Sequence, residues 1–170
     1  MSEDQIVKLA REAIEEYVLH GRRKEEPEPL PSQMERRRGV FVSIKKDGNL
    51  RGCIGTTSPT QPNIAQEIIS NAISASNHDP RFSPVRPEEL DQLQISVDIL
   101  GEQEPVSSLE ELDSDKYGVV VQKDHRSGLL LPDLEGINTA AEQVEIAKKK
   151  AGIPARAEVD LYRFEVERHS

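Results

Sequence analysis

A cysteine lies between two glycines, Gly52 and Gly55, in the hexapeptide LRGCIG at residues 50–55. Glycine inside a strand packs no side chain, so such a pair usually marks a bulge, a bend or a close backbone approach. A bend here would leave the backbone amides around Cys53 uncovered, which suits an anion or an oxyanion. Arg51 would add a fixed positive charge and a bidentate donor. The alternative is a structural cysteine that packs as a small hydrophobe, and spacing alone favours it.

Residues 77–82 (NHDPRF) hold a histidine and an aspartate that could complete a cysteine-based catalytic site. His78 would serve as the general base for Cys53, with Asp79 orienting its ring. The ordinary explanation of His78 is a favourable interaction with the C-terminal end of a helix dipole, since Pro80 ends the preceding helix. Nothing in the spacing brings these side chains together, so both interpretations stay open.

The remaining histidines, at positions 20, 125 and 169, are isolated from one another. No HxxxH, HExxH or CxxC spacing suggests a zinc site. The glycines match neither a phosphate-binding loop nor a dinucleotide-binding pattern. We therefore expect no dedicated metal site and no tightly bound cofactor.

Amphipathic helices and alternating strands are predicted to position the candidate residues. Helices are expected at residues 4–19 and 63–76, where apolar residues recur at three- and four-residue spacing. A third helix is expected at residues 139–151, where Thr139 and Glu142 make a capping box. Strands are predicted where apolar and polar residues alternate. Two hairpins are expected, one formed by residues 40–44 with the strand from residue 50 onward and one by residues 119–121 with 129–131. Single strands are expected at residues 93–99 and, as the last strand, at 159–166. The apolar face switches within the last strand, which suggests a bulge or burial on both faces.

The order of these elements indicates the fold class. Paired strands joined by short turns, without regular βαβ alternation, predict an α+β fold with a mainly antiparallel sheet flanked by helices. A chain of 170 residues is about one domain's worth, so a single domain over residues 1–170 is expected. The sequence has no evident internal repeat.

The charge of the chain argues against a nucleic-acid partner. The formal net charge is −9, and residues 83–117 alone carry ten acids against two cations. A field of this sign repels phosphate backbones. No apolar run is long enough for a membrane helix, the N-terminus does not resemble a secretory signal, and a single cysteine fits a reducing compartment. We therefore expect a soluble, cytoplasmic protein that binds neither nucleic acid nor membranes.

Four motifs taken together resemble the AMMECR-type domain family. They occur in order along the chain, at residues 38–43 (RGVFVS), 50–55 (LRGCIG), 79–82 (DPRF) and 126–132 (RSGLLLP). Microbial members of this family are called component A of the AmmeMemoRadiSam system. The resemblance covers essentially the whole chain, and four ordered motifs make it specific.

The resemblance implies a fold, a site and partners, but no reaction. It implies a two-lobed α+β fold, with a larger and a smaller lobe, and a cleft lined by residues 50–55. It also implies association with a Memo-type protein and a radical SAM enzyme, whose genes accompany those of the microbial members.

Two hypotheses about function differ in what Cys53 does. In the first, the chain is an enzyme in which Cys53 is the nucleophile, assisted by Arg51 and His78, on an anionic substrate. In the second, the chain is a noncatalytic module that binds a small molecule or a protein segment, and Cys53 only packs. Its ligand-binding residues would be Gly52, Gly55, Asp79 and Arg81, with Arg51 helping to hold a carboxylate or phosphate.

Overall fold

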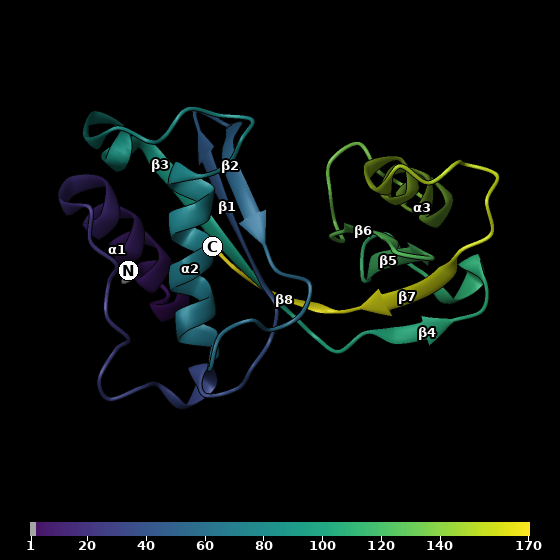
Figure 1. Ribbon diagram of the computed structural model, residues 1–170, viewed down its shortest axis with the longest axis horizontal. Coiled ribbons are helices and arrows are strands. Elements are labelled where there is room, and N and C mark those ends of the chain that lie inside the picture. Colours follow the sequence, from purple (N-terminus) through teal and green to yellow (C-terminus); the bar gives the residue numbers. More distant parts are fainter. Residues whose placement is uncertain (1–2) are drawn as a thin grey trace. The chain divides into compact units, whose positions relative to one another are not determined.

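The computed structural model describes residues 3–170, which fold into two compact units (Figure 1). Unit 1 comprises the chain up to Leu100 together with Glu167–Ser170, and unit 2 comprises Gly101–Val166. Unit 1 packs two helices and unit 2 packs one helix on a four-stranded sheet, and most of the strand pairings are antiparallel. The predicted α+β class is therefore confirmed, although the strands form two sheets rather than one.

Unit 1 holds the candidate residues on a sheet with strand order β2-β1-β3-β8. The strands are β1 (Val40–Lys46), β2 (Asn49–Gly55), β3 (Leu93–Leu100) and β8 (Val166–His169). Two helices, α1 (Gln5–His20) and α2 (Ile64–Asn77), cover one face of this sheet (Figure 1). The 3-10 turns η1 (Ser32–Met34) and η2 (Pro87–Gln92) lie in the connections.

The two helices of unit 1 begin and end where capping chemistry predicts. Asp4 accepts a hydrogen bond from the backbone N–H of Ile6, and Gly21 ends α1 in the left-handed conformation with φ 65°. Asn63 caps α2 in the same way as Asp4 caps α1, and His78 is its C-cap. The helices predicted at 4–19 and 63–76 are thus confirmed to within a residue.

Unit 2 repeats this plan with one helix. Its sheet has the order β4-β7-β5-β6, formed by β4 (Glu104–Val106), β5 (Gly118–Lys123), β6 (Arg126–Leu130) and β7 (Asp160–Phe164). Helix α3 (Ala140–Ala151) packs on β5 and β6, and η3 (Leu109–Glu111) precedes β5. Thr139 caps α3 through the backbone N–H of Glu142, as the capping box predicts.

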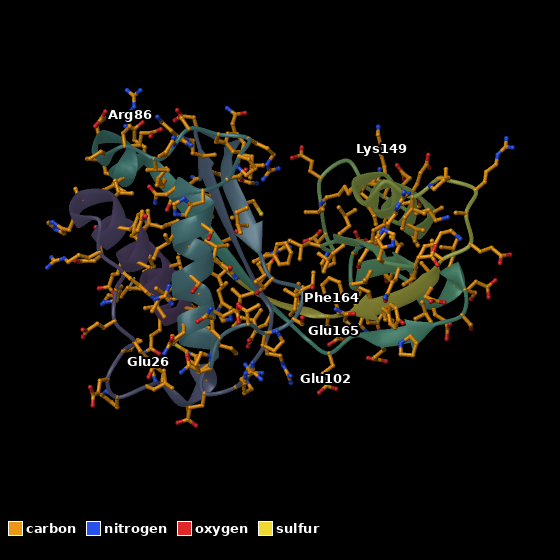
Figure 2. All side chains as sticks on the ribbon, in the orientation of Figure 1. Glu26, Arg86, Glu102, Lys149, Phe164 and Glu165 are labelled. Atoms are coloured by element: carbon orange, nitrogen blue, oxygen red, sulfur yellow. The ribbon has the colours of Figure 1, made fainter. Side chains whose placement is uncertain are left out.

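The prediction of a single last strand at residues 159–166, with a bulge or burial on both faces, is wrong. Residues 160–164 form β7 of the second sheet, and residues 166–169 form β8 of the first. Glu165 is the break between them, next to the buried ring of Phe164 (Figure 2). The apolar face switches because each piece packs on its own sheet, and not because one strand bulges.

The two faces of the unit 1 sheet differ in chemistry. Val40, Val42 and Ile44 of β1 are buried against the helices. Side chains alternate along a strand, so Ser43 and its cross-strand partner Cys53 point to the opposite face. The candidate thiol therefore lies on the side of the sheet that α1 and α2 do not cover.

Candidate functional site

A β-bulge carries Arg51 out of the regular ladder of β2. On β1, Lys45 pairs with Leu50 and Ile44 pairs with Gly52, so Arg51 is the extra residue between two registered pairs. A bulge bends the strand and re-aims the side chain that it inserts. The bulge directs the Arg51 side chain toward residues 83–89, the segment that follows α2 in the sequence.

Arg51 is bound at both ends of its guanidinium by the segment that follows α2. Its Nε and Nη2 donate to the two carboxylate oxygens of Glu89, both at 3.0 Å, and Nη1 and Nη2 donate to the carbonyls of Ser83 and Pro84 at 2.8 and 3.2 Å. The two side chains are 14% and 12% exposed. Arg51 thus fastens the segment 83–89 to the hairpin, and its donors already have partners.

The Glu89 carboxylate accepts several hydrogen bonds that hold the segment 83–89. It accepts from Arg51, from Lys46 Nζ at 3.1 Å and from the backbone N–H of Arg86 at 2.8 Å. The hydrogen bonds from Arg51 are the main cause that lowers the pKa of Glu89 to about 2. The carboxylate therefore stays charged at neutral pH and balances Arg51.

The two glycines of the hexapeptide are explained by packing. A Cβ on Gly52 would overlap the carbonyl oxygen of Ala75, so α2 lies directly on the backbone of β2 there. A Cβ on Gly55 would overlap the ring of Phe41, its cross-strand partner. Both positions therefore require glycine for contacts within unit 1, with no ligand needed to explain them.

Cys53 is half-buried, and its backbone is engaged on both sides. Its Sγ lies 3.3 Å from Ser43 Oγ. Its backbone N–H donates to Asp79 Oδ2 at 3.0 Å, and its carbonyl accepts from Arg81 Nη2 at 3.1 Å. The expectation of an uncovered Cys53 amide is wrong, because β2 is an edge strand and the Asp79 carboxylate takes the place that a neighbouring strand would fill.

Asp79 and Arg81 form a clamp on this edge. Asp79 Oδ1 accepts from the backbone N–H and Nε of Arg81, both at 3.0 Å, and Oδ2 accepts from Nη2 at 2.7 Å. These bonds hold the pKa of Asp79 well below its usual range. The Asp79 side chain is only 2% exposed, whereas that of Arg81 is 55% exposed. The clamp thus presents a fixed guanidinium to solvent beside Cys53.

The structure does not join His78 to Cys53. The His78 ring packs edge-on against Tyr17 of α1, with 5.9 Å between the ring centroids, on the helix side of the sheet. Asp79, which was to orient His78, binds Arg81 and the Cys53 amide instead. Within residues 3–170 no hydrogen bond connects the histidine with either residue, so the Cys/His/Asp arrangement does not form.

A fully buried carboxylate holds the loop that follows β2, and sequence analysis missed it. Glu67 of α2 accepts from the backbone N–H groups of Thr60 and Gln61 at 2.8 and 3.0 Å, and from the hydroxyls of Thr56 and Thr60 at 2.9 and 2.7 Å. Ser43 and Glu89 were also missed. Ser43 was predictable from the hairpin register, whereas Glu67 and Glu89 carry no local sequence signal.

Among residues 3–170, no three side chains of His, Cys, Asp or Glu are grouped so that they could hold a metal ion. No helix in that range is long and apolar enough to cross a membrane.

The AMMECR1 family model matches residues 7–169, which is nearly the whole chain. The chain belongs to the AMMECR1 family. The resemblance drawn from the four motifs is thus confirmed. A protein of Thermotoga maritima is 53% identical over 172 residues, which cover 99% of this chain and 99% of that protein.

Other AMMECR1 relatives differ in length and in what is known of their structure. Protein CA_C1420 of Clostridium acetobutylicum is 50% identical, and the match covers 98% of this chain but only 36% of that protein. The crystal structure of the uncharacterized protein PH0010 from Pyrococcus horikoshii is similar with a TM-score of 0.89 and 33% identity, over 96% of this chain and 88% of that one. These names report no activity.

Proposed function

We propose that this AMMECR1-family chain is a noncatalytic binding module that holds an anionic group of a ligand at Arg81, beside Cys53. The single observation that carries the proposal is the state of Arg81. Its guanidinium is fixed by Asp79 and by the Cys53 carbonyl, yet its side chain is 55% exposed.

An immobilised, exposed guanidinium suits an incoming anion. Ordering a long side chain normally opposes binding, and here that entropy is already lost in the free protein. Among the contacts of residues 3–170, Arg81 Nη1 donates no hydrogen bond. This leaves donors for a carboxylate or a phosphate, the groups that guanidinium recognises best. The Phe82 ring, 5.4 Å from the guanidinium carbon, shields one side.

The residues that an enzyme would need are otherwise occupied. The Cys53 amide is bonded to Asp79, and the Arg51 guanidinium is bonded to Glu89, Ser83 and Pro84. Neither is available as a ready-made oxyanion donor. This supports a binding role in which Arg81 acts and Arg51 only holds the fold.

The test has two stages. Native mass spectrometry of protein isolated from its own source is read for a co-purifying ligand. Inorganic phosphate and acetate are then titrated into isotope-labelled protein while the backbone amide signals of residues 53 and 82, which every variant retains, are followed by NMR. Wild type and Cys53→Ala should bind alike, and Arg81→Gln should bind at least about tenfold more weakly.

Arg86→Gln is the matched control, because it removes one charge from an exposed arginine of the same unit. Equal binding by Arg81→Gln and wild type would exclude the proposal. Arg81→Lys separates charge from geometry, since an ammonium cannot reproduce the bidentate contact with Asp79.

A cysteine-dependent enzyme remains the second candidate because of one observation. The half-buried Cys53 thiol has the Ser43 hydroxyl at 3.3 Å, a group that could donate to a thiolate. This alternative expects rapid alkylation of Cys53 in the native protein. Reaction only after unfolding would remove the nucleophile hypothesis.

A Memo-type protein and a radical SAM enzyme are the proposed partners, in the cytoplasm. Support comes from membership of the AMMECR1 family, whose microbial members the four-motif resemblance associates with those two proteins. Co-purification of either protein with a tagged chain from the native host would support the association. Recovery of neither under gentle lysis would count against it.

A further inference from the structure

One end of unit 2 gathers positive charge in an otherwise acidic chain. The hairpin turn of β5 and β6 together with the end of α3 supplies six cations, which we call the basic pole: Lys123, Arg126, Lys148, Lys149, Lys150 and Arg156. Only one acid, Asp124, lies within the two segments 123–128 and 148–156. Since the whole chain carries −9 and these segments carry +5, the remainder carries −14.

Hydrogen bonds bring the two segments of the basic pole together. Arg126 Nη1 donates to the carbonyl of Gly152 at 2.6 Å, which joins the hairpin turn to the end of α3. Lys150 Nζ donates to the carbonyl of Leu129 on β6 at 3.4 Å. The hairpin turn and the end of α3, which lie apart in the sequence, are therefore neighbours in space.

The partners of these cations are neutral. Lys148 Nζ donates to the carbonyls of Ala155 and Ala157 at 3.0 and 2.9 Å. Like the bonds of Arg126 and Lys150, these contacts fix the side chain without cancelling its charge. Within residues 3–170 none of the six cations forms an ion pair, whereas Arg51 and Arg81 of unit 1 are both paired with carboxylates.

Three members of the basic pole project from this ordered base. Lys123, Lys149 and Arg156 are exposed, and none donates a hydrogen bond within the described part of the chain. Lys149 points away from α3 into solvent in Figure 2. The α3 dipole explains lysines in the last helical turn. It does not account for Lys123 and Arg156, which lie outside the helix.

We propose that the basic pole is a docking surface for an acidic protein segment. The charge −14 on the rest of the chain favours a short acidic segment over a long polyanion, because an extended nucleic acid would also meet the repelling field. Arg126, Lys148 and Lys150, which are held beside neutral carbonyls, keep their attraction for carboxylates while losing less freedom on binding. This inference does not rest on the proposed function at Arg81.

The test measures fluorescence anisotropy of a labelled peptide of about ten Asp and Glu residues with the full chain at low salt. Wild type should bind the peptide, and Kd should rise about tenfold or more between about 0.05 and about 0.2 M NaCl. The triple variant Lys123→Gln/Lys149→Gln/Arg156→Gln should weaken binding at least about tenfold. These side chains donate no described hydrogen bond, so their loss should leave the fold intact.

The matched control is Lys8→Gln/Lys45→Gln/Arg86→Gln, which removes the same charge from exposed positions of unit 1. This control should bind the peptide within about twofold of wild type. Equal loss in both triple variants would mean a response to net charge alone and would overturn the proposal. So would absence of binding by wild type, or tighter binding of an RNA of equal charge.

Discussion

The two units follow one plan, and the comparison separates scaffold from function. In each, a hairpin leads into a helix and then into a strand that pairs with the first strand of the hairpin: β1-β2-α2-β3 in unit 1 and β5-β6-α3-β7 in unit 2. Each hairpin turns through an aspartate with positive φ, Asp47 at 53° and Asp124 at 54°. Features that recur belong to the plan, and features confined to one unit need another explanation.

The glycine facing the helix recurs. A Cβ on Gly52 would overlap the carbonyl oxygen of Ala75, and a Cβ on Gly128 would overlap that of Ala147. Both glycines follow the hairpin turn and sit opposite a buried residue of the first strand, Ile44 in unit 1. Gly52 and Gly128 thus allow the helix to pack closely on the sheet in both units.

Arg51 and the polar pair next to Gly52 do not recur. Between turn and glycine, β2 holds Arg51 in a bulge, whereas β6 holds Arg126 and Ser127 in regular register. At the next cross-strand pair, unit 1 has Ser43 with Cys53 and unit 2 has Val120 with Leu129. The plan can therefore be built without a bulged arginine or a thiol, which points to a special role for unit 1.

The largest expected effect tests the shared glycine. Gly52→Ala and Gly128→Ala should each lower the free energy of unfolding by about 3 kcal/mol or more, because the new methyl meets helix backbone that cannot rotate away. Denaturant unfolding measures both. Gly48→Ala is the control: its φ is 78° with open space around it, so strain alone should cost about 1 kcal/mol. Equal costs at Gly48 and Gly52 would contradict the packing explanation.

The next effect tests the residue that only unit 1 has. Arg51→Ala should lower the free energy of unfolding by about 2–3 kcal/mol, because Glu89 loses its bidentate partner while remaining 12% exposed. Arg51→Lys should recover only part of this. The exposed Arg86→Ala serves as control and should cost under about 0.5 kcal/mol. A small loss at Arg51 would show that segment 83–89 does not depend on the bulge.

The pH dependence of stability tests the same contact from the carboxylate side. Because the pKa of Glu89 is lowered to about 2, its stabilising contribution is complete above its ordinary value of 4.5 and disappears as the pH falls through about 2. Glu89→Gln should therefore cost about 1–2 kcal/mol at pH 7, and the difference from wild type should close below about pH 2. Urea midpoints across this range give the comparison. A gap that stays constant with pH would mean that the charge is irrelevant.

Local signals predicted most elements, and long-range contacts account for what was missed. Caps and periodicity located the helices, and turn residues located both hairpins, because these depend on neighbours in sequence. Glu89 lies 38 residues from Arg51, so only the folded chain brings them together. The division of the predicted last strand into β7 and β8 was missed for a similar reason, since nothing local indicates that Phe164 and Val166 belong to different sheets.

The sequence predicted where the candidate site lies but not which hydrogen bonds its residues make. Residues 50–55 and 79–82 do meet, through the contact of Asp79 with the Cys53 amide. In the folded chain, the Asp79 carboxylate occupies the Cys53 amide, and the Arg81 side chain is exposed while that of Arg51 is not. Both facts depend on which side chains reach the edge of β2. Residue types alone do not contain that information.

The smallest change in stability is expected when the Ser43/Cys53 pair of unit 1 is replaced by the corresponding pair of unit 2. Ser43→Val with Cys53→Leu copies the pair of unit 2 into unit 1. Because both sites are half-buried and the exchange is apolar, the free energy of unfolding should change by under about 1 kcal/mol. The reverse exchange, Val120→Ser with Leu129→Cys, should cost about 2 kcal/mol or more, since those side chains are only 4% and 9% exposed. If Ser43→Val with Cys53→Leu lowers the free energy of unfolding as much as the reverse exchange does, Ser43 and Cys53 are part of the scaffold. If that free energy hardly changes while ligand binding or alkylation does, the two residues serve function and not stability.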